Sequence, residues 1–224
     1  MSSLAWGRID AVILDMDGLI LDSERMALGL LAQAAEDLGL PWRADVGLAM
    51  VGLDSRDSDQ VIRRHLGADF PVAELRQAFG ERYGAAIAER RIDAKPGVRE
   101  LLDVLDKVGL PRAVATSTQR SRARAKLTAV GLFERFHGLV CGDEVARGKP
   151  APDIFLAAAR LLAAAPGSCL VLEDSNAGAR GALAAGMRVV IVPDLLSPDA
   201  DLLAAGTPVC ASLHEVAAQF LSRA

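Results

Sequence analysis

The chain contains five short runs of almost uninterrupted apolar residues, each long enough to form one buried strand. Segments in which apolar residues recur with helical spacing separate these runs, for example residues 98–110, 119–131 and 153–165. Strands that are apolar on both faces and alternate with helices are typical of a parallel sheet covered on both sides. The five predicted strands are Ala11–Asp15, Pro111–Ser117, His137–Gly142, Ser168–Asp174 and Met187–Asp194.

One long interval interrupts this alternation directly after the first strand. Residues 19–92 contain no comparable strand run, whereas stretches 24–40, 58–67 and 73–91 have helical periodicity and composition. We therefore predict an α/β fold, a doubly wound, Rossmann-like parallel sheet core with an inserted all-helical domain. The core would comprise residues 1–18 and 93–224, and the helical domain residues 19–92.

Composition and charge narrow the classes of partner. The formal net charge of the 224 residues is -4, without long blocks of like charge, which argues against nucleic acid as the main partner. No apolar run reaches the length of about 18 residues that a membrane span needs, and the N-terminus does not resemble a secretory signal. The three cysteines form no C-x-x-C pair, which favours a reducing compartment. We expect a cytoplasmic protein, as a monomer or a weak homo-oligomer, with no membrane or nucleic-acid partner.

Acidic, hydroxyl and basic residues follow the strands at positions where a ligand would bind. In an open parallel sheet, ligands bind beyond the carboxyl ends of the strands. Four segments that are far apart in the sequence should bring their polar residues to this edge. They are Asp15 and Asp17 after the first strand, Thr116 and Ser117 after the second, Lys149 beyond the third, and Glu173 and Asp174 after the fourth.

Four carboxylates at one edge would repel one another. Two like charges about 4 Å apart repel by roughly 4 kcal/mol at an effective dielectric constant of about 20. A cluster of Asp15, Asp17, Glu173 and Asp174 would need protonation or a cation, and an all-oxygen set favours a hard cation such as Mg²⁺. Together with a lysine and hydroxyl donors, such a cluster is typical of a site that handles a phosphoryl group.

Four motifs, DMDG, VATST, GKPAPDIF and LEDSNAG, extend from Asp15 to Gly178. In their order and spacing the chain resembles the haloacid dehalogenase-like (HAD) hydrolase superfamily, in the branch with a helical cap after the first strand. This branch includes β-phosphoglucomutase, phosphoglycolate phosphatase and sugar-phosphate phosphatases. The resemblance implies an enzyme that acts on a small phosphorylated metabolite, with residues 19–92 as its cap.

The resemblance also implies roles for the motif residues in catalysis. Asp15 would be the nucleophile that forms an aspartyl-phosphate. Asp17 would protonate the leaving group and then activate water as a base. Thr116 and the backbone around Ser117 would hold the phosphoryl oxygens, and Lys149 would balance their charge.

Metal binding and substrate recognition follow from the same resemblance. Asp15, the main-chain carbonyl of Asp17 and Asp174 would bind Mg²⁺, with Glu173 as a further ligand or as the neighbour of one. The family often carries a substrate-facing arginine on the cap, at the place of Arg56 in VGLDSRDS. Arg56 either contacts substrate or pairs on the surface with Asp54, Asp57 or Asp59.

Several functions fit these residues to different degrees. A Mg²⁺-dependent phosphatase is favoured over a β-phosphoglucomutase, because such mutases carry a cap histidine a few residues beyond D-x-D. Here that place reads RMALG, residues 25–29, and no histidine occurs between Asp15 and His65. A phosphoacceptor receiver domain would lack the large helical insertion. Dehalogenation is disfavoured because the dehalogenases of the superfamily lack the second aspartate, which is Asp17 here.

Overall fold

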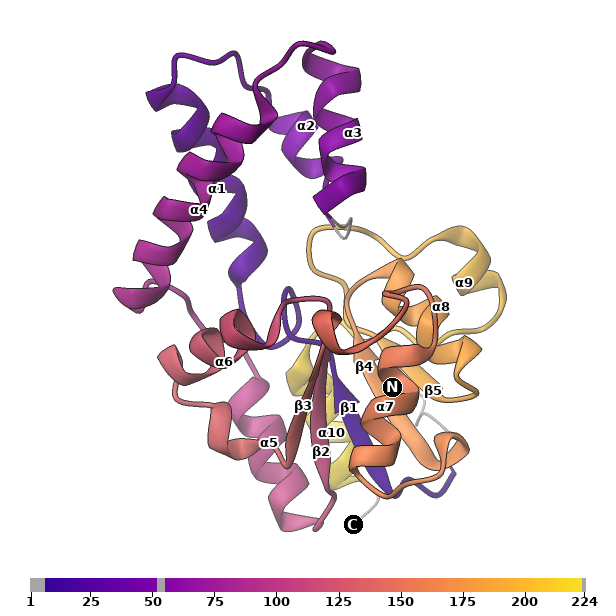
Figure 1. The fold of residues 1–224 in the computed structure, drawn as a ribbon. Coiled ribbons are helices and arrows are strands. Elements are labelled where there is room, and N and C mark those ends of the chain that lie inside the picture. The colour runs from indigo at the N-terminus through magenta and orange to yellow at the C-terminus, as the bar shows by residue number, and fades with distance from the viewer. Residues whose placement is uncertain (1–6, 52–54, 223–224) are drawn as a thin grey trace. The chain divides into compact units, whose positions relative to one another are not determined.

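A computed structural model of the protein describes residues 7–51 and 55–222 (Figure 1). The chain divides into two compact units, one formed by Met1–Leu21 with Ala94–Ala224 and the other by Asp22–Asp93. None of the helices in the described ranges combines the length and hydrophobicity that a membrane span requires.

The first unit is built on a five-stranded sheet whose neighbouring strands are all parallel. Its strand order is β3-β2-β1-β4-β5. Strands β2 and β3 extend the sheet to one side of β1 and strands β4 and β5 to the other, so the strand order reverses between β1 and β4. Such a reversal is the point where ligands bind in doubly wound sheets. Each strand lies within one of the predicted runs, and the α/β fold class is confirmed. The strands are β1 (Ala11–Leu14), β2 (Arg112–Thr116), β3 (Gly138–Cys141), β4 (Cys169–Glu173) and β5 (Arg188–Ile191).

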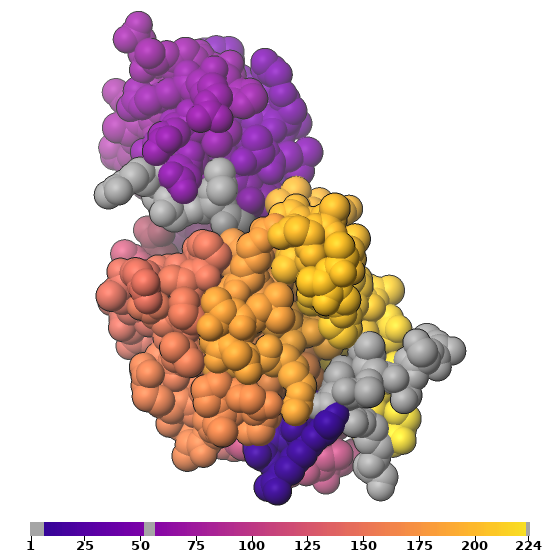
Figure 2. Space-filling model, turned by 90° about the vertical axis from the view of Figure 1, so that its right-hand side faces the viewer, coloured from indigo at the N-terminus to yellow at the C-terminus, as the bar shows by residue number. Residues whose placement is uncertain are grey.

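Helices cover both faces of this sheet. Alternate strand residues, such as Ile13 and Val171, share one buried cluster with Phe155 of α7 and Ala179 of α8, because successive side chains point to opposite faces. In Figure 1, α7 lies in front of the sheet and α10 behind it. Orange and yellow residues of α7, α8 and α9 form much of the surface seen in Figure 2. The helices of this unit are α5 (Val98–Lys107), α6 (Arg120–Ala129), α7 (Asp153–Leu161), α8 (Asn176–Ala184), α9 (Ala200–Ala204) and α10 (Leu213–Leu221).

The second unit is helical throughout its described residues. Its buried cluster includes Leu31 and Ala34 of α1, Ile62 of α3 and Leu75 of α4. The helical periodicity predicted α1, α3 and α4 but not α2, whose five residues are too short to show a period. The unit extends from Asp22 to Asp93, whereas residues 19–92 were expected. Its helices are α1 (Ser23–Asp37), α2 (Ala44–Leu48), α3 (Ser55–Leu66) and α4 (Val72–Ala88).

The two chain segments that lead into and out of the helical unit run side by side. Leu21 and Ala94 form an isolated antiparallel bridge. The backbone N–H of Lys95 donates to the carbonyl oxygen of Ile20 at 2.8 Å. The ammonium of Lys95 also donates to Asp194 Oδ1 at 2.6 Å. Asp194 follows β5, so this ion pair ties the returning segment to the sheet.

Replacing Phe155 by alanine tests the packing of α7 on the sheet. Phe155 is fully buried, so we expect the free energy of unfolding to fall by about 3–5 kcal/mol, as for other buried aromatic residues. Urea unfolding followed by circular dichroism measures the change. Leu161→Ala is the control, because Leu161 lies on the same helix but is 43% exposed. Equal losses for both variants would contradict this packing.

Candidate active site

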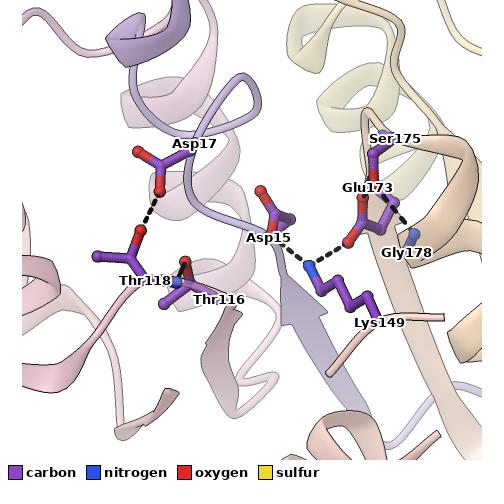
Figure 3. Close-up of polar contacts among 8 residues, drawn as sticks. All are labelled: Asp15, Asp17, Thr116, Thr118, Lys149, Glu173, Ser175 and Gly178. Atoms are coloured by element: carbon purple, nitrogen blue, oxygen red, sulfur yellow. Dashed lines mark hydrogen bonds and ion pairs between the residues drawn. The ribbon is translucent and has the colours of Figure 1, made fainter. Parts of the chain in front are cut away.

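Asp15 and Glu173 lie at the carboxyl ends of the neighbouring strands β1 and β4 (Figure 3). The parallel register pairs Leu14 of β1 with Leu172 of β4, which places the following residues, Asp15 and Glu173, next to each other. The backbone N–H of Asp15 continues the ladder by donating to the carbonyl oxygen of Leu172 at 3.0 Å. Both carboxylates are buried. The sheet therefore fixes two acids at its switch point.

The ammonium of Lys149 lies between these two carboxylates. It donates to Asp15 Oδ1 and to Glu173 Oε1, and the side chain of Lys149 is only 7% exposed. Its Nζ also lies 5.3 Å from the centre of the Phe155 ring, within the range of a cation–π interaction. Burying charged groups is unfavourable unless opposite charges pair closely. The lysine therefore stabilises two carboxylates that would otherwise repel each other.

Glu173 is held by further contacts on its second oxygen. Glu173 Oε2 accepts hydrogen bonds from the backbone N–H of Ser175 at 3.1 Å and from Ser175 Oγ at 2.9 Å. Ser175 Oγ in turn accepts from the backbone N–H of Gly178 and thereby caps α8. A Cβ atom at Gly178 would collide with the Glu173 carboxylate. The glycine of LEDSNAG thus makes room for the acid.

Burial and neighbouring charges shift the pKa values of Asp15 and Lys149. Burial raises the pKa of the Asp15 carboxyl to about 8, and repulsion from Glu173 adds to the rise, although Lys149 opposes it. Burial alone would lower the pKa of Lys149, but the carboxylates of Asp15 and Glu173 outweigh it and raise that pKa above its ordinary value. One ammonium therefore does not balance the acids around it.

A third acid, Asp174, completes a set of oxygen atoms that fits a hard cation. Asp15, Glu173 and Asp174 are all buried, and each offers one oxygen within 4.8 Å of the others. When ionised, they exceed the single charge of Lys149 by two. Mg²⁺ prefers carboxylate oxygens and keeps several waters, so charge and ligand chemistry both suit a divalent cation of this kind.

The carboxylate of Asp17 does not join this set, contrary to the cluster of four acids expected from the sequence. Asp17 Oδ2 accepts from Thr118 Oγ1 at 2.6 Å, and Oδ1 accepts from Lys126 Nζ at 2.7 Å. Figure 3 shows the carboxylate turned toward Thr118. The chain bends sharply after β1, where Gly18 has a φ of +87°. The donors that hold this side chain, Thr118 and Lys126, both follow β2 in the chain.

The hydroxyl residues after β2 occupy different environments. Thr116 is buried at the end of β2, next to β1, and its Oγ1 accepts from the backbone N–H of Thr118 at 3.1 Å. Ser117 is exposed. A threonine hydroxyl that accepts one hydrogen bond can still donate its own proton. Thr116 therefore retains the capacity to bind an anionic oxygen.

Some residues of the site escaped the sequence analysis, and one predicted residue remains untested. The side chain of Arg56 lies outside the described part of the structure. Lys126 was not predicted, although it shares the buried face of α6 with Ala123 and Leu127. A lysine on an apolar helical face was the signal that could have identified it. Thr118 belongs to VATST, but nothing in the sequence indicated its contact with Asp17.

Adding a methyl group at Gly178 tests how tightly Glu173 must be held. We expect Gly178→Ala to displace the Glu173 carboxylate and to lower kcat/KM at least about tenfold, the range for partners that orient a catalytic group. Gly167→Ala is the matched control, because a Cβ at Gly167 meets no atom within 4 Å. Unchanged activity in both variants would show that the position of Glu173 is not critical.

Comparisons with known proteins identify the family of this chain. The family model for haloacid dehalogenase-like hydrolases matches residues 9–186. The chain is 34% identical to protein CbbY of Rhodobacter capsulatus over 208 residues, which cover 88% of this chain and 91% of that protein. It is 30% identical to a phosphorylated carbohydrates phosphatase of Thermotoga maritima, over 93% of this chain and 96% of the relative.

A solved structure shows the same fold over almost the whole chain. The crystal structure of a putative beta-phosphoglucomutase from Thermotoga maritima superposes with a TM-score of 0.80 at 28% sequence identity. The match covers 96% of this chain and 99% of that one. This chain therefore belongs to the haloacid dehalogenase-like hydrolases and is an enzyme of their phosphoric monoester hydrolase type.

Proposed function

We propose that the protein is a Mg²⁺-dependent phosphatase that hydrolyses a small phosphorylated metabolite, of the sugar-phosphate or phosphoglycolate type, through an aspartyl-phosphate on Asp15. The observation that carries the proposal is the buried Asp15–Lys149–Glu173 group at the switch point of the sheet, with Asp174 beside it. The phosphorylated carbohydrates phosphatase among the relatives supports the substrate class.

In this proposal, two of the three buried acids bind the metal ion, and the third orients Lys149. Asp15, Asp174 and the main-chain carbonyl of Asp17 would hold Mg²⁺. Glu173 has both oxygens engaged, one by Lys149 and one by Ser175, so we assign it to the orientation of Lys149. When bound, Mg²⁺ would supply positive charge that offsets the phosphoryl oxygens and keeps Asp15 ionised.

The reaction would proceed in two displacements at phosphorus. A carboxylate oxygen of Asp15 attacks the phosphorus atom, and the electron pair of the breaking P–O bond passes to the ester oxygen, which takes a proton from Asp17. A water molecule then attacks the aspartyl-phosphate and gives a proton to Asp17. The bond between phosphorus and Asp15 breaks, which releases inorganic phosphate and restores both aspartates.

The remaining residues of the site would bind the phosphoryl group and the rest of the substrate. Thr116 and the backbone at Ser117 would donate to phosphoryl oxygens, and Lys149 would balance their charge. The helical unit would serve as the cap that excludes bulk water during the reaction. Arg56 on α3 would contact the non-reacting part of the substrate.

Release of inorganic phosphate from a panel of phosphate monoesters tests the proposed activity. With Mg²⁺ present, we expect phosphate from at least one sugar phosphate or from phosphoglycolate, and we expect EDTA to abolish the release until Mg²⁺ is restored in excess. β-Glucose 1-phosphate belongs in the panel as the substrate of the alternative, a β-phosphoglucomutase. Conversion of this compound to an isomer without phosphate release would replace the phosphatase by that mutase.

Replacing the proposed nucleophile tests the covalent step. We expect Asp15→Asn to lower kcat at least about 1,000-fold, because an amide cannot form the acyl phosphate. The fold should persist, since Lys149 keeps its contact with Glu173, and thermal unfolding measures this. Glu134→Gln, an exposed acid-to-amide change in the same unit, is the control. Near wild-type turnover by Asp15→Asn would exclude the proposed mechanism.

A further inference from the structure

A second buried lysine, Lys126 on α6, lies beside the site without a part in the reaction described above. Its side chain is 7% exposed, and its Nζ lies 2.7 Å from Asp17 Oδ1. The hydroxyl of Thr118 donates to the other oxygen of the same carboxylate at 2.6 Å. Asp17 itself is 23% exposed, so the carboxylate is held from the protein side and still reaches solvent.

We propose that Lys126 is a positioning residue for proton transfer by Asp17. Its ammonium would fix Oδ1, so that the carboxyl group presents its other oxygen to the ester oxygen of the substrate. The inference rests on the proposed role of Asp17 as proton donor. Lys126 does not touch substrate in this proposal and acts only through Asp17.

The placement of Lys126 on its helix favours a role beyond stability. Ala123, Lys126 and Leu127 form the buried face of α6, where an apolar residue would pack without loss of hydration. Burial of an ammonium is unfavourable unless a partner compensates it, and replacing a buried ion pair by apolar residues is often neutral or stabilising. Packing alone therefore gives no reason for a lysine here, whereas an effect on the Asp17 carboxylate does.

The two donors hold the carboxylate in different ways. Thr118 lies in the loop after β2 and its hydroxyl can rotate, whereas Lys126 is carried by a helix and delivers a full charge. A carboxyl group that is protonated on Oδ2 still accepts a hydrogen bond on Oδ1. The contact with Lys126 can therefore persist while a proton moves from Oδ2 to the ester oxygen and the P–O electron pair moves to that same oxygen.

Two aryl phosphates of similar shape isolate this role. p-Nitrophenolate leaves without needing a proton. Phenol, like the side chain of tyrosine, has a pKa of about 10, so phenolate is a poorer leaving group and benefits from a proton donor. We expect Lys126→Met to lower kcat/KM for phenyl phosphate at least about tenfold, within the usual contribution of general acid catalysis. For p-nitrophenyl phosphate the loss should stay below about threefold, because no proton is needed.

Matched variants separate positioning from a structural effect. Arg122→Met, an exposed change on the same helix, should alter neither rate. Lys126→Arg keeps the positive charge and should recover part of the phenyl phosphate rate. Equal losses for both substrates in Lys126→Met, or no loss for either, would overturn the positioning role. If Lys126→Met does not fold, as judged by thermal unfolding, Lys126→Gln replaces it in the same measurements.

A double variant tests whether Lys126 acts only through Asp17. In an Asp17→Asn background, Lys126→Met should cause less than a further twofold loss with phenyl phosphate, because residues that act as a unit are not additive. A further loss as large as in the wild type would overturn the proposal. If Asp17→Asn alone retains wild-type rates, the proposed role of Asp17 is wrong and the positioning role fails with it. If Asp17→Asn is slow but Lys126→Met is not, only the positioning role fails.

Discussion

The buried ammonium of Lys149 is the interaction on which the arrangement of the site depends. Parallel pairing of β1 with β4 forces Asp15 and Glu173 together, and both are buried, so their repulsion is poorly screened. Lys149 donates to both acids. Its positive charge offsets the repulsion between the two carboxylates, which would otherwise disfavour this pairing of the strands. The GKPAPDIF segment that carries the lysine leads into α7, whose Phe155 packs in the sheet core and faces the same ammonium. The ion pairs of Lys149 and the packing of Phe155 therefore both hold this segment against the sheet.

The acids at the sheet edge separate into two groups with different lysine partners. Asp15 and Glu173 share Lys149, whereas Asp17 is bound by Lys126 and Thr118. In the proposed mechanism, this separation assigns attack on phosphorus to one group and handling of the proton to the other. Two aspartates only two residues apart can therefore act differently, because each lies in its own set of donors.

The sequence predicted the parts of this protein that depend on pattern along the chain. Strands apolar on both faces indicated a buried parallel sheet. Because the carboxyl ends of parallel strands lie at one edge of the sheet, Asp15, Lys149 and Glu173 were predicted to lie close together. The orientation of Asp17 depends instead on donors more than 100 positions away in the sequence, so no local pattern could indicate it. Lys126 was missed because it is one of four basic residues in α6, with Arg120, Arg122 and Arg124, and only its place on the face of Ala123 and Leu127 distinguishes it.

The antiparallel bridge between Leu21 and Ala94 has a consequence for how such an enzyme can diversify. Because the two ends of the helical insertion are direct neighbours, the sheet needs from the insertion only that its termini lie close together. A longer, shorter or differently folded segment could occupy this place without shifting the register of β1, since the entropy of closing a loop grows only slowly with its length. If the helical unit recognises the substrate as proposed, its replacement would change recognition while the reacting groups on the sheet stay in place.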